Sequence, residues 1–208
     1  CGLKSSGKHD LALVQNLGPI KAAAAVFTSN RCQANPILWS KEAIKDGQIE
    51  AIVLNSGGAN CYTGPEGFQT THQTAELVSE LLEVSAFDVL VCSTGLIGEQ
   101  LDREKLLAGV KAAAHEASAT GGEAASLAIM TTDSVPKRSE REGAGYRIGA
   151  MAKGAGMLAP GLATMLVVIT TDAVLDSKTL DLALRKATAV SFDRLDSDGC
   201  MSTNDQVT

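Results

Sequence analysis

Thr164 is the residue whose position in the sequence most clearly suggests covalent chemistry. It stands in the stretch KGAGMLAPGLATMLVVITTDA, residues 153–173, between a glycine-rich loop and one of the most apolar runs of the chain. A threonine at the start of a chain has an α-amino group, with a pKa of ~8, that can accept the proton of its own hydroxyl. Inside a chain the same nitrogen is an amide. A nucleophilic Thr164 therefore requires cleavage of the Ala163–Thr164 bond, whereas the simpler interpretation makes it a β-branched strand residue.

The same hydroxyl can carry out this cleavage. Thr164 Oγ attacks the Ala163 carbonyl, the acyl group shifts from nitrogen to oxygen, and water then hydrolyses the ester. Backbone strain assists such a reaction, and Pro160 and Gly161 lie just before the bond. We therefore expect a hydroxyl that acts twice, first on its own backbone and then on a substrate.

Glycine, serine, threonine and asparagine gather in three stretches where strands are expected to end. These are NSGGANCYTG (residues 55–64), CSTGLIGEQ (92–100) and KGAGMLAPGLATM (153–165). Loops at strand ends often hold ligands in α/β proteins, so the three loops could form one site; alternatively, they are only turns. The sequence contains no G-x-x-x-x-G-K-[ST] or G-x-G-x-x-G pattern, which disfavours a nucleotide-binding module, and no G-x-S-x-G elbow for a serine hydrolase.

The elements that would position these loops alternate between strand and helix. Strands are predicted at residues 10–16, 22–28, 50–54, 88–92 and 164–171, and a further strand at the closing STNDQVT. Helices are predicted after Thr71, after Asp102 as N-cap, and after Asp176 or Ser177. This alternation predicts an α/β fold with helices layered over sheet. LGP at residues 17–19 predicts a hairpin between the first two strands, hence a partly antiparallel sheet, and the polar KRSEREGAG (137–145) predicts a solvated loop.

Composition narrows the class of protein. The 208 residues include 18 Lys and Arg against 24 Asp and Glu, for a formal charge of −6, and 3% are aromatic, which argues against nucleic-acid binding. No apolar run approaches the ~20 residues that span a bilayer, and no signal peptide is evident, so we expect no membrane association and a cytoplasmic location. The five cysteines are dispersed, without a C-x-x-C pair, and are interpreted as reduced packing residues; the three histidines are interpreted as surface residues. No metal site is predicted.

The sequence resembles the ornithine acetyltransferase (glutamate N-acetyltransferase) family of arginine biosynthesis. The stretches that carry the resemblance occur in family order over nearly the whole chain: GLKSSGKHDLALV, AAVFTSNR, VLNSGGANCYTGPEG, CSTGLIGE, AIMTTDSVPK, MAKGAGMLAPGLATML, TTDA and FDRLDSDGCMSTND. The resemblance implies that Thr164 is the nucleophile and that the precursor is cut at Ala163–Thr164. It also implies an oxyanion hole from Thr94 and Gly95, and substrate contacts from Thr131 and Lys153.

The resemblance further implies acetyl transfer from N-acetylornithine to glutamate by a ping-pong route through acetyl-Thr164, with acetyl-CoA as a donor in some members and no cofactor. The fold expected is a layered sandwich of mixed or antiparallel β-sheet with helices. Residues 1–163 would belong to an α-chain and residues 164–208 would begin a β-chain, with such pairs assembling into a heterotetramer.

Two features bear on how much of such an enzyme this sequence contains. The acidic run Asp193, Asp196, Asp198 and Asp205 looks like a metal cluster, but the resemblance makes it a structural element near the cut. Family members are longer at both ends, and the sequence begins with Cys1 instead of methionine, so we expect a fragment with an incomplete pocket. Two other functions stay open: an amidase or aminopeptidase that uses an N-terminal threonine and gives the acyl group to water, and a non-catalytic binding module.

Overall fold

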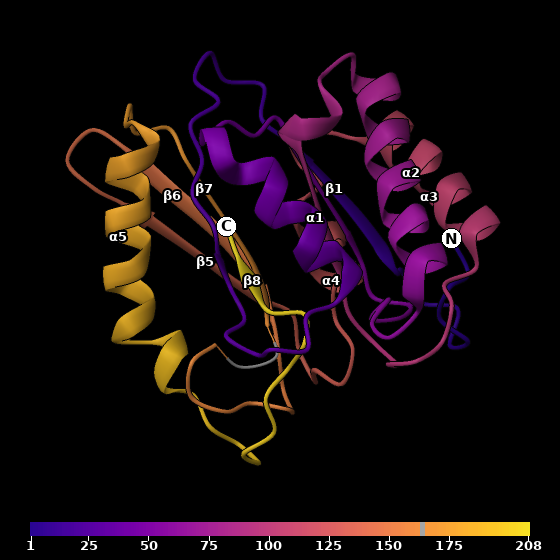
Figure 1. Ribbon diagram of the computed structural model, residues 1–208. Coiled ribbons are helices and arrows are strands. Elements are labelled where there is room, and N and C mark those ends of the chain that lie inside the picture. The colour runs from indigo at the N-terminus through magenta and orange to yellow at the C-terminus, as the bar shows by residue number, and fades with distance from the viewer. Residues whose placement is uncertain (163–164) are drawn as a thin grey trace.

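Two β-sheets pack face to face, and helices cover their outer faces (Figure 1). The computed structural model describes residues 1–162 and 165–208. The first sheet has the order β1-β3-β4, and the second has the order β2-β8-β7-β6-β5. The strands of the first sheet are β1 (Leu11–Gln15), β3 (Ala51–Asn55) and β4 (Val89–Ser93); those of the second are β2 (Val26–Phe27), β5 (Lys137–Glu142), β6 (Arg147–Lys153), β7 (Leu166–Thr171) and β8 (Gln206–Val207). The expected α/β sandwich with mixed sheets is confirmed.

Strand directions differ from the expectation at one connection. β1 pairs antiparallel with β3, and β3 pairs parallel with β4. β2 lies in the other sheet, where it pairs with β8, so the predicted hairpin at residues 17–19 is wrong. The turn itself exists, because the Asn16 side chain accepts a hydrogen bond from Gly18 N at 2.9 Å and donates one to Ile20 O at 2.9 Å. It leads the chain from one sheet to the other.

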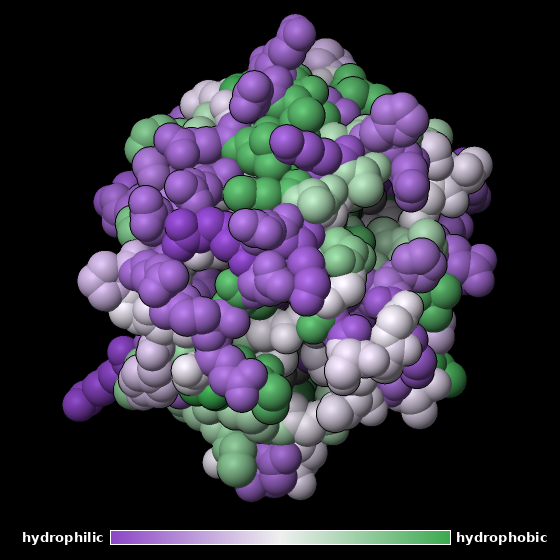
Figure 2. All heavy atoms as spheres, turned by 90° about the vertical axis from the view of Figure 1, so that its right-hand side faces the viewer, coloured by the Kyte–Doolittle hydropathy of each residue, from purple (hydrophilic) through white to green (hydrophobic). Residues whose placement is uncertain are grey.

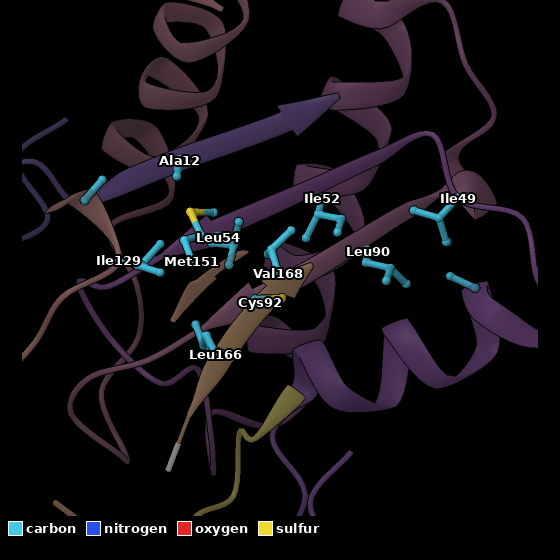
Figure 3. Close-up of a cluster of buried hydrophobic side chains, with 12 residues drawn as sticks. Ala12, Ile49, Ile52, Leu54, Leu90, Cys92, Ile129, Met151, Leu166 and Val168 are labelled. Atoms are coloured by element: carbon cyan, nitrogen blue, oxygen red, sulfur yellow. The ribbon is translucent and has the colours of Figure 1, made fainter. Parts of the chain in front are cut away.

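The main apolar core lies between the two sheets (Figure 3). Successive strand residues point to opposite faces. In β3, Ile52 and Leu54 therefore point to the inter-sheet core, while Val53 packs under the helices on the other face. From the second sheet, Met151, Leu166 and Val168 complete the core. Because both faces of β3 and β4 are covered, all ten of their residues are buried, and both read as continuous apolar runs.

Three helices cover the outer faces of the sandwich. α2 (Gly64–Leu82) and α3 (Arg103–Glu116) pack on the first sheet, and α5 (Ser177–Ala189) packs on the second. Asp102 and Asp176 are the N-caps, and their side chains accept hydrogen bonds from the backbone N–H groups of Lys105 and Thr179. The side of the molecule formed by α2 and α3 is largely hydrophilic, with smaller apolar areas between the polar side chains (Figure 2).

Two helices that the sequence did not predict lie at the edges of the first sheet. α1 (Asn35–Ala43) runs along β4, and α4 (Gly122–Ala128) lies beside β1. Ser40 Oγ accepts from Val91 N at 3.0 Å and donates to Val91 O at 2.9 Å, while Trp39 Nε1 donates to Val89 O at 3.0 Å. Side chains of α1 thus satisfy the free backbone groups of an edge strand, which would otherwise be open to pairing with another chain.

Three further expectations need correction. Of the predicted loop at residues 137–145, residues 137–142 are instead the strand β5, which pairs with β6 over six residue pairs and has only exposed side chains, as suits an edge strand, while residues 143–145 belong to the exposed turn that leads to β6. α2 begins at Gly64 instead of after Thr71, since Pro65 suits a first helical turn. The strand predicted at residues 22–28 is reduced to β2. Short 3-10 turns η1 (Ile44–Asp46), η2 (Ala86–Asp88) and η3 (Phe192–Arg194) complete the described elements.

Cysteines and histidines bear on two smaller expectations. Cys61 and Cys92 are buried, but the free Cys1, Cys32 and Cys200 are exposed, so the packing interpretation is wrong for three of the five. Burial raises the pKa of the Cys92 thiol, which makes this residue an inert core side chain. All three histidines are exposed, as expected. Among the described residues, no helix combines the length and the apolar character needed to cross a membrane.

Candidate active site

The three glycine-rich loops of the sequence meet beside the carboxyl ends of β3 and β4. These strands are parallel and in register at Asn55 and Ser93, so the loops that follow them start at the same sheet edge. Ala59 N donates to Leu96 O at 2.8 Å, and Gly98 N donates to Cys61 O at 2.9 Å. The third loop begins at the end of β6, whose last residue, Lys153, reaches the second loop.

Thr94 and Lys153 are in direct contact. Lys153 Nζ donates a hydrogen bond to Thr94 Oγ1 at 3.1 Å, and the two residues are 2% and 5% exposed respectively. An ammonium group can only donate, so the Thr94 oxygen accepts and its hydroxyl hydrogen remains directed elsewhere. The arrangement produces a polarised O–H donor at the end of β4.

Gly95 is a position where only glycine fits. Its φ is +135°, a backbone conformation that side chains disfavour. A Cβ atom there would lie 2.8 Å from Gly58 N and 2.9 Å from Gly58 Cα. The backbones of the first two loops therefore approach each other at Gly95, next to the Thr94 hydroxyl.

The environment of Lys153 perturbs its ionisation. Burial lowers the pKa of the ammonium from 10.5 to about 8, even though the nearby Asp133 and Asp205 carboxylates oppose this shift. Lys137 and Lys4 lie close enough to lower it further. The site thus contains a cation in a largely dehydrated environment, where an added anion would be strongly attracted.

Thr131 lies near Lys153, and a carboxylate links their segments. Thr131 is exposed, and its backbone N–H donates to Asp133 Oδ2 at 3.2 Å. Asp133 Oδ1 accepts from Gly154 N at 2.8 Å and from the Lys137 ammonium. Burial by itself raises the pKa of Asp133, but these hydrogen bonds hold it below its usual value. Asp133 belongs to the MTTD motif, and its role could not be separated from that of Thr131 by sequence alone.

A second carboxylate, that of Asp205, contacts Met165, the residue that follows Thr164. Met165 N donates to Asp205 Oδ1 at 2.9 Å, and Thr28 N donates to Asp205 O at 3.0 Å. Asp205 is 0% exposed. The neighbouring Asn204 donates to Ala59 O at 2.7 Å and to Ser93 O at 2.9 Å, which connects this segment to both of the first two loops.

The rest of the acidic run supports the backbone before the proposed cut. Asp193 O accepts from Gly161 N at 3.1 Å, and Asp198 Oδ2 accepts from Met157 N at 2.8 Å. In the part of the chain that the structure describes, no three His, Cys, Asp or Glu side chains are grouped to hold a metal ion.

Ala163 and Thr164 lie outside the described residues. Two residues further on, Leu166 is the first residue of β7 and pairs with both Lys153 of β6 and Gln206 of β8. Gly161 and Leu162, the two residues before Ala163, line a hollow of about 460 Å³ together with residues of β2, α1 and α5. Thr94 and Lys153 are not among its lining residues.

Comparison with known proteins shows the family. The model of the ArgJ family matches residues 1–208, and the chain belongs to this family. The bifunctional arginine-biosynthesis protein ArgJ of Streptomyces coelicolor is 62% identical over 206 residues, which cover 99% of this chain and 54% of that protein. The ArgJ protein of Mycobacterium tuberculosis is 54% identical over 214 residues, which cover 99% of this chain and 53% of that protein. This chain therefore spans about half the length of these relatives.

Two solved structures share the fold. The crystal structure of ornithine acetyltransferase from Mycobacterium tuberculosis, complexed with ornithine, matches with a TM-score of 0.70 and 48% identity over 79% of this chain and 88% of that chain. The crystal structure of the arginine-biosynthesis bifunctional protein ArgJ from Bacillus halodurans matches with a TM-score of 0.64 and 28% identity, over 79% of this chain and 86% of that chain.

Proposed function

We propose that this chain is part of an acetyltransferase that moves the acetyl group of N-acetylornithine to glutamate through an acetyl-Thr164 intermediate. The observation that carries the proposal is the buried contact between Lys153 and Thr94, beside Gly95. It places a cation and a polarised hydroxyl donor next to the strand that Thr164 precedes. Such groups suit the developing negative charge of acyl transfer.

The nucleophile in this proposal is made by cleavage of the chain. Thr164 Oγ attacks the Ala163 carbonyl carbon, the carbon–nitrogen bond breaks, and the hydroxyl proton passes to the departing nitrogen. Water then hydrolyses the ester, which leaves Ala163 with a carboxylate and Thr164 with a free amine. That amine is the base that activates the hydroxyl for its second reaction.

Acetyl transfer then needs stabilisation of an oxyanion. When Thr164 Oγ attacks the acetyl carbonyl, the Thr94 hydroxyl and the Gly95 backbone N–H are the two donors assigned to the oxygen. The Thr94 hydrogen is suited to this role because its oxygen already accepts from Lys153. Loss of one such donor typically slows the reaction by ~10²–10³-fold.

The substrates in the proposal match the charge of the site. N-acetylornithine and glutamate both carry an α-carboxylate, and Lys153 is the cation assigned to it, with Thr131 as a second contact. Because Lys153 is nearly dehydrated, a carboxylate within reach would gain more attraction than at an exposed lysine.

Chain lengths among the relatives support the proposed cut. The solved Mycobacterium tuberculosis chain is 88% covered by a match to 79% of the 208 residues here, so that chain is shorter than this one. The ArgJ protein of the same species is nearly twice as long as this chain. A precursor divided into two pieces of similar length would account for both observations. In this proposal residues 1–163 form the end of one piece and residues 164–208 begin the other.

Three further features belong to the proposal. Acetyl-CoA is a second acetyl donor, in keeping with the word bifunctional in the relatives' names. The two pieces of the precursor remain associated and assemble into a heterotetramer. The enzyme acts in the cytoplasm.

Intact-mass measurement tests the cleavage. The protein, expressed from its gene with any sequence that flanks these 208 residues, should give two polypeptides that separate between Ala163 and Thr164. Thr164→Ala should give one uncut polypeptide, while the control Thr170→Ala, an exposed position on β7, should be cut normally. Wild-type protein that stays uncut would refute the proposal.

Single-turnover kinetics test the acceptor. Isolated acetyl-enzyme should lose its acetyl group much faster when glutamate is added, and acetylglutamate should form in equal amount. Deacetylation at one rate with and without glutamate would identify water as the acceptor, and therefore an amidase.

A further inference from the structure

Asp205 is a buried carboxylate that has no part in the acetyl transfer proposed above. Its side chain is completely buried, and one carboxylate oxygen, Oδ1, accepts the backbone N–H of Met165 at 2.9 Å. The other oxygen, Oδ2, is buried and has no hydrogen-bond partner within the described residues. Buried polar atoms are nearly always paired, so this unpaired carboxylate oxygen requires an explanation.

The pKa of the Asp205 carboxyl group is also unusual. Burial raises its pKa from 3.8 to about 7, although the hydrogen bond from Met165 N, the nearby Ser202 and Thr28 side chains and the charge of Lys153 all act to lower it. The folded state therefore holds the proton more tightly than the unfolded chain does. The free energy of unfolding therefore decreases as the pH rises from 3.8 through about 7, and above pH 7 the ionised carboxylate destabilises the folded state.

The sequence and one hydrogen bond place Asp205 next to the bond that is cut. Met165 directly follows Thr164, and its backbone N–H donates to Asp205 Oδ1 at 2.9 Å, so the carboxylate is held at the peptide bond after Thr164. A buried anion favours a proton on a nitrogen close to it.

We propose that Asp205 is a positioning residue for the cleavage at Ala163–Thr164: it holds the backbone directly after Thr164 and supplies the negative charge that favours protonation of the departing nitrogen. This inference rests on the proposed function, since it concerns the reaction that creates the nucleophile. The proton comes from the Thr164 hydroxyl, so no further reactant is needed. Asp205 acts in its ionised form and forms no covalent bond.

Other charged groups around the site must be considered with Asp205. Lys153 is the charged group that acts on Asp205 directly, and Lys153 is in turn influenced by Asp133, Lys137 and Lys4. Of the carboxylates among these, Asp133 accepts from Lys137 and from two backbone N–H groups. Its pKa is held below the usual value, so Asp133 stays ionised through the neutral range. Lys153, whose pKa is about 8, also titrates in the tested range, so the change in cleavage rate around pH 7 is assigned to Asp205 only where Asp205→Asn removes it.

The test compares Asp205→Asn with a matched control. Asparagine keeps an acceptor for Met165 N but removes the charge. Asp198→Asn is the control, because Asp198 belongs to the same acidic run and also accepts backbone N–H groups, but is exposed. The uncut full-length protein is made by cell-free translation, and the cut fraction is followed by intact mass between about pH 5.5 and pH 8.5.

We expect Asp205→Asn to be cut at least 10-fold more slowly than wild type at pH 8, and Asp198→Asn within twofold of it. The wild-type rate should rise as the pH passes 7, and the Asp205→Asn rate should lack this rise. The thermal unfolding midpoint of Asp205→Asn at pH 8 should equal or exceed that of the wild type, since the substitution removes a buried charge that destabilises the folded state. A purely structural residue would instead lower the midpoint.

Three results would overturn the inference. These are a wild-type cleavage rate in Asp205→Asn, a slow rate accompanied by a lower midpoint, or a pH profile that the substitution leaves unchanged. Wild-type protein transferred from pH 5.5 to pH 8 gives a check without any substitution, because cleavage should begin after the transfer. Normal cleavage of Asp205→Asn leaves the proposed function intact, whereas an uncut wild-type protein refutes both.

Discussion

Replacing Lys153 by methionine tests whether the cation of the candidate site is held at a cost to the fold. Lys153 is 2% exposed, and burial lowers its pKa from 10.5 to about 8. One pKa unit corresponds to about 1.4 kcal/mol, so at pH 7 the ammonium destabilises the folded state by about 3 kcal/mol. Methionine has a similar shape and no charge. After about 1–1.5 kcal/mol for the lost hydrogen bond to Thr94, we expect Lys153→Met to raise the free energy of unfolding by about 1–2 kcal/mol.

This gain should depend on pH in a defined direction. Because the folded pKa lies below the unfolded value, the unfolded chain binds more protons between about pH 8 and pH 10.5. Wild-type stability therefore rises over this range, and about 2 kcal/mol of the destabilisation is gone at pH 9.5. The methionine variant lacks the titrating group, so its advantage at pH 7 should vanish or reverse at pH 9.5.

Urea unfolding followed by tryptophan fluorescence measures this difference. Trp39 is the single tryptophan and is buried between α1 and the first sheet, so its emission reports on the core. Wild type, Lys153→Met and the exposed control Lys111→Met are compared at about pH 7, 8 and 9.5 with reductant present. A difference between wild type and Lys153→Met that stays constant across the three pH values would refute the reasoning about the buried charge.

Three further substitutions test the geometry around the site. Gly95→Ala would place its Cβ against Gly58 at a positive φ, so we expect a loss of about 2–4 kcal/mol in unfolding free energy and loss of acetyl transfer, measured by denaturation and by acetylglutamate formation. Ser40→Ala removes both hydrogen bonds to Val91, and urea denaturation should show a loss of about 1–3 kcal/mol. Asp133→Asn should lower the free energy of unfolding at pH 7; since the folded pKa of Asp133 is depressed, this deficit should shrink as the pH falls below about 4, and an unchanged deficit would contradict the assignment.

The part of the fold that could be predicted from the sequence is the part with strong patterns. Buried strands β3 and β4 are continuous apolar runs, and α3 and α5 begin at aspartate N-caps, so their existence and start were correct. α1 was missed because it packs against a strand edge through Ser40 and Trp39 as well as through apolar side chains. β5 was missed because its residues are all charged or polar, and only its pairing with β6 makes it a strand.

The candidate site was predictable only in part. The loops that carry Thr94 and Lys153 stood out by their composition, and the structure brings these two residues into contact. The importance of Asp205 could not be inferred, because the sequence places it among other aspartates and only the fold sets it against Met165 N. The roles assigned to Thr164, Thr94, Gly95, Thr131 and Lys153 remain predictions.

The strand order of the second sheet affects how the protein can refold before and after the proposed cleavage. β6 comes before the proposed cut, while β7 and β8 come after it, and β7 lies between the other two. One polypeptide can assemble this sheet by an intramolecular search. Once the chain is cut, assembly of the sheet requires the association of two polypeptides, so recovery from denaturation would depend on protein concentration. The intact precursor can thus refold as a single chain, whereas the cleaved protein can refold only when its two polypeptides associate.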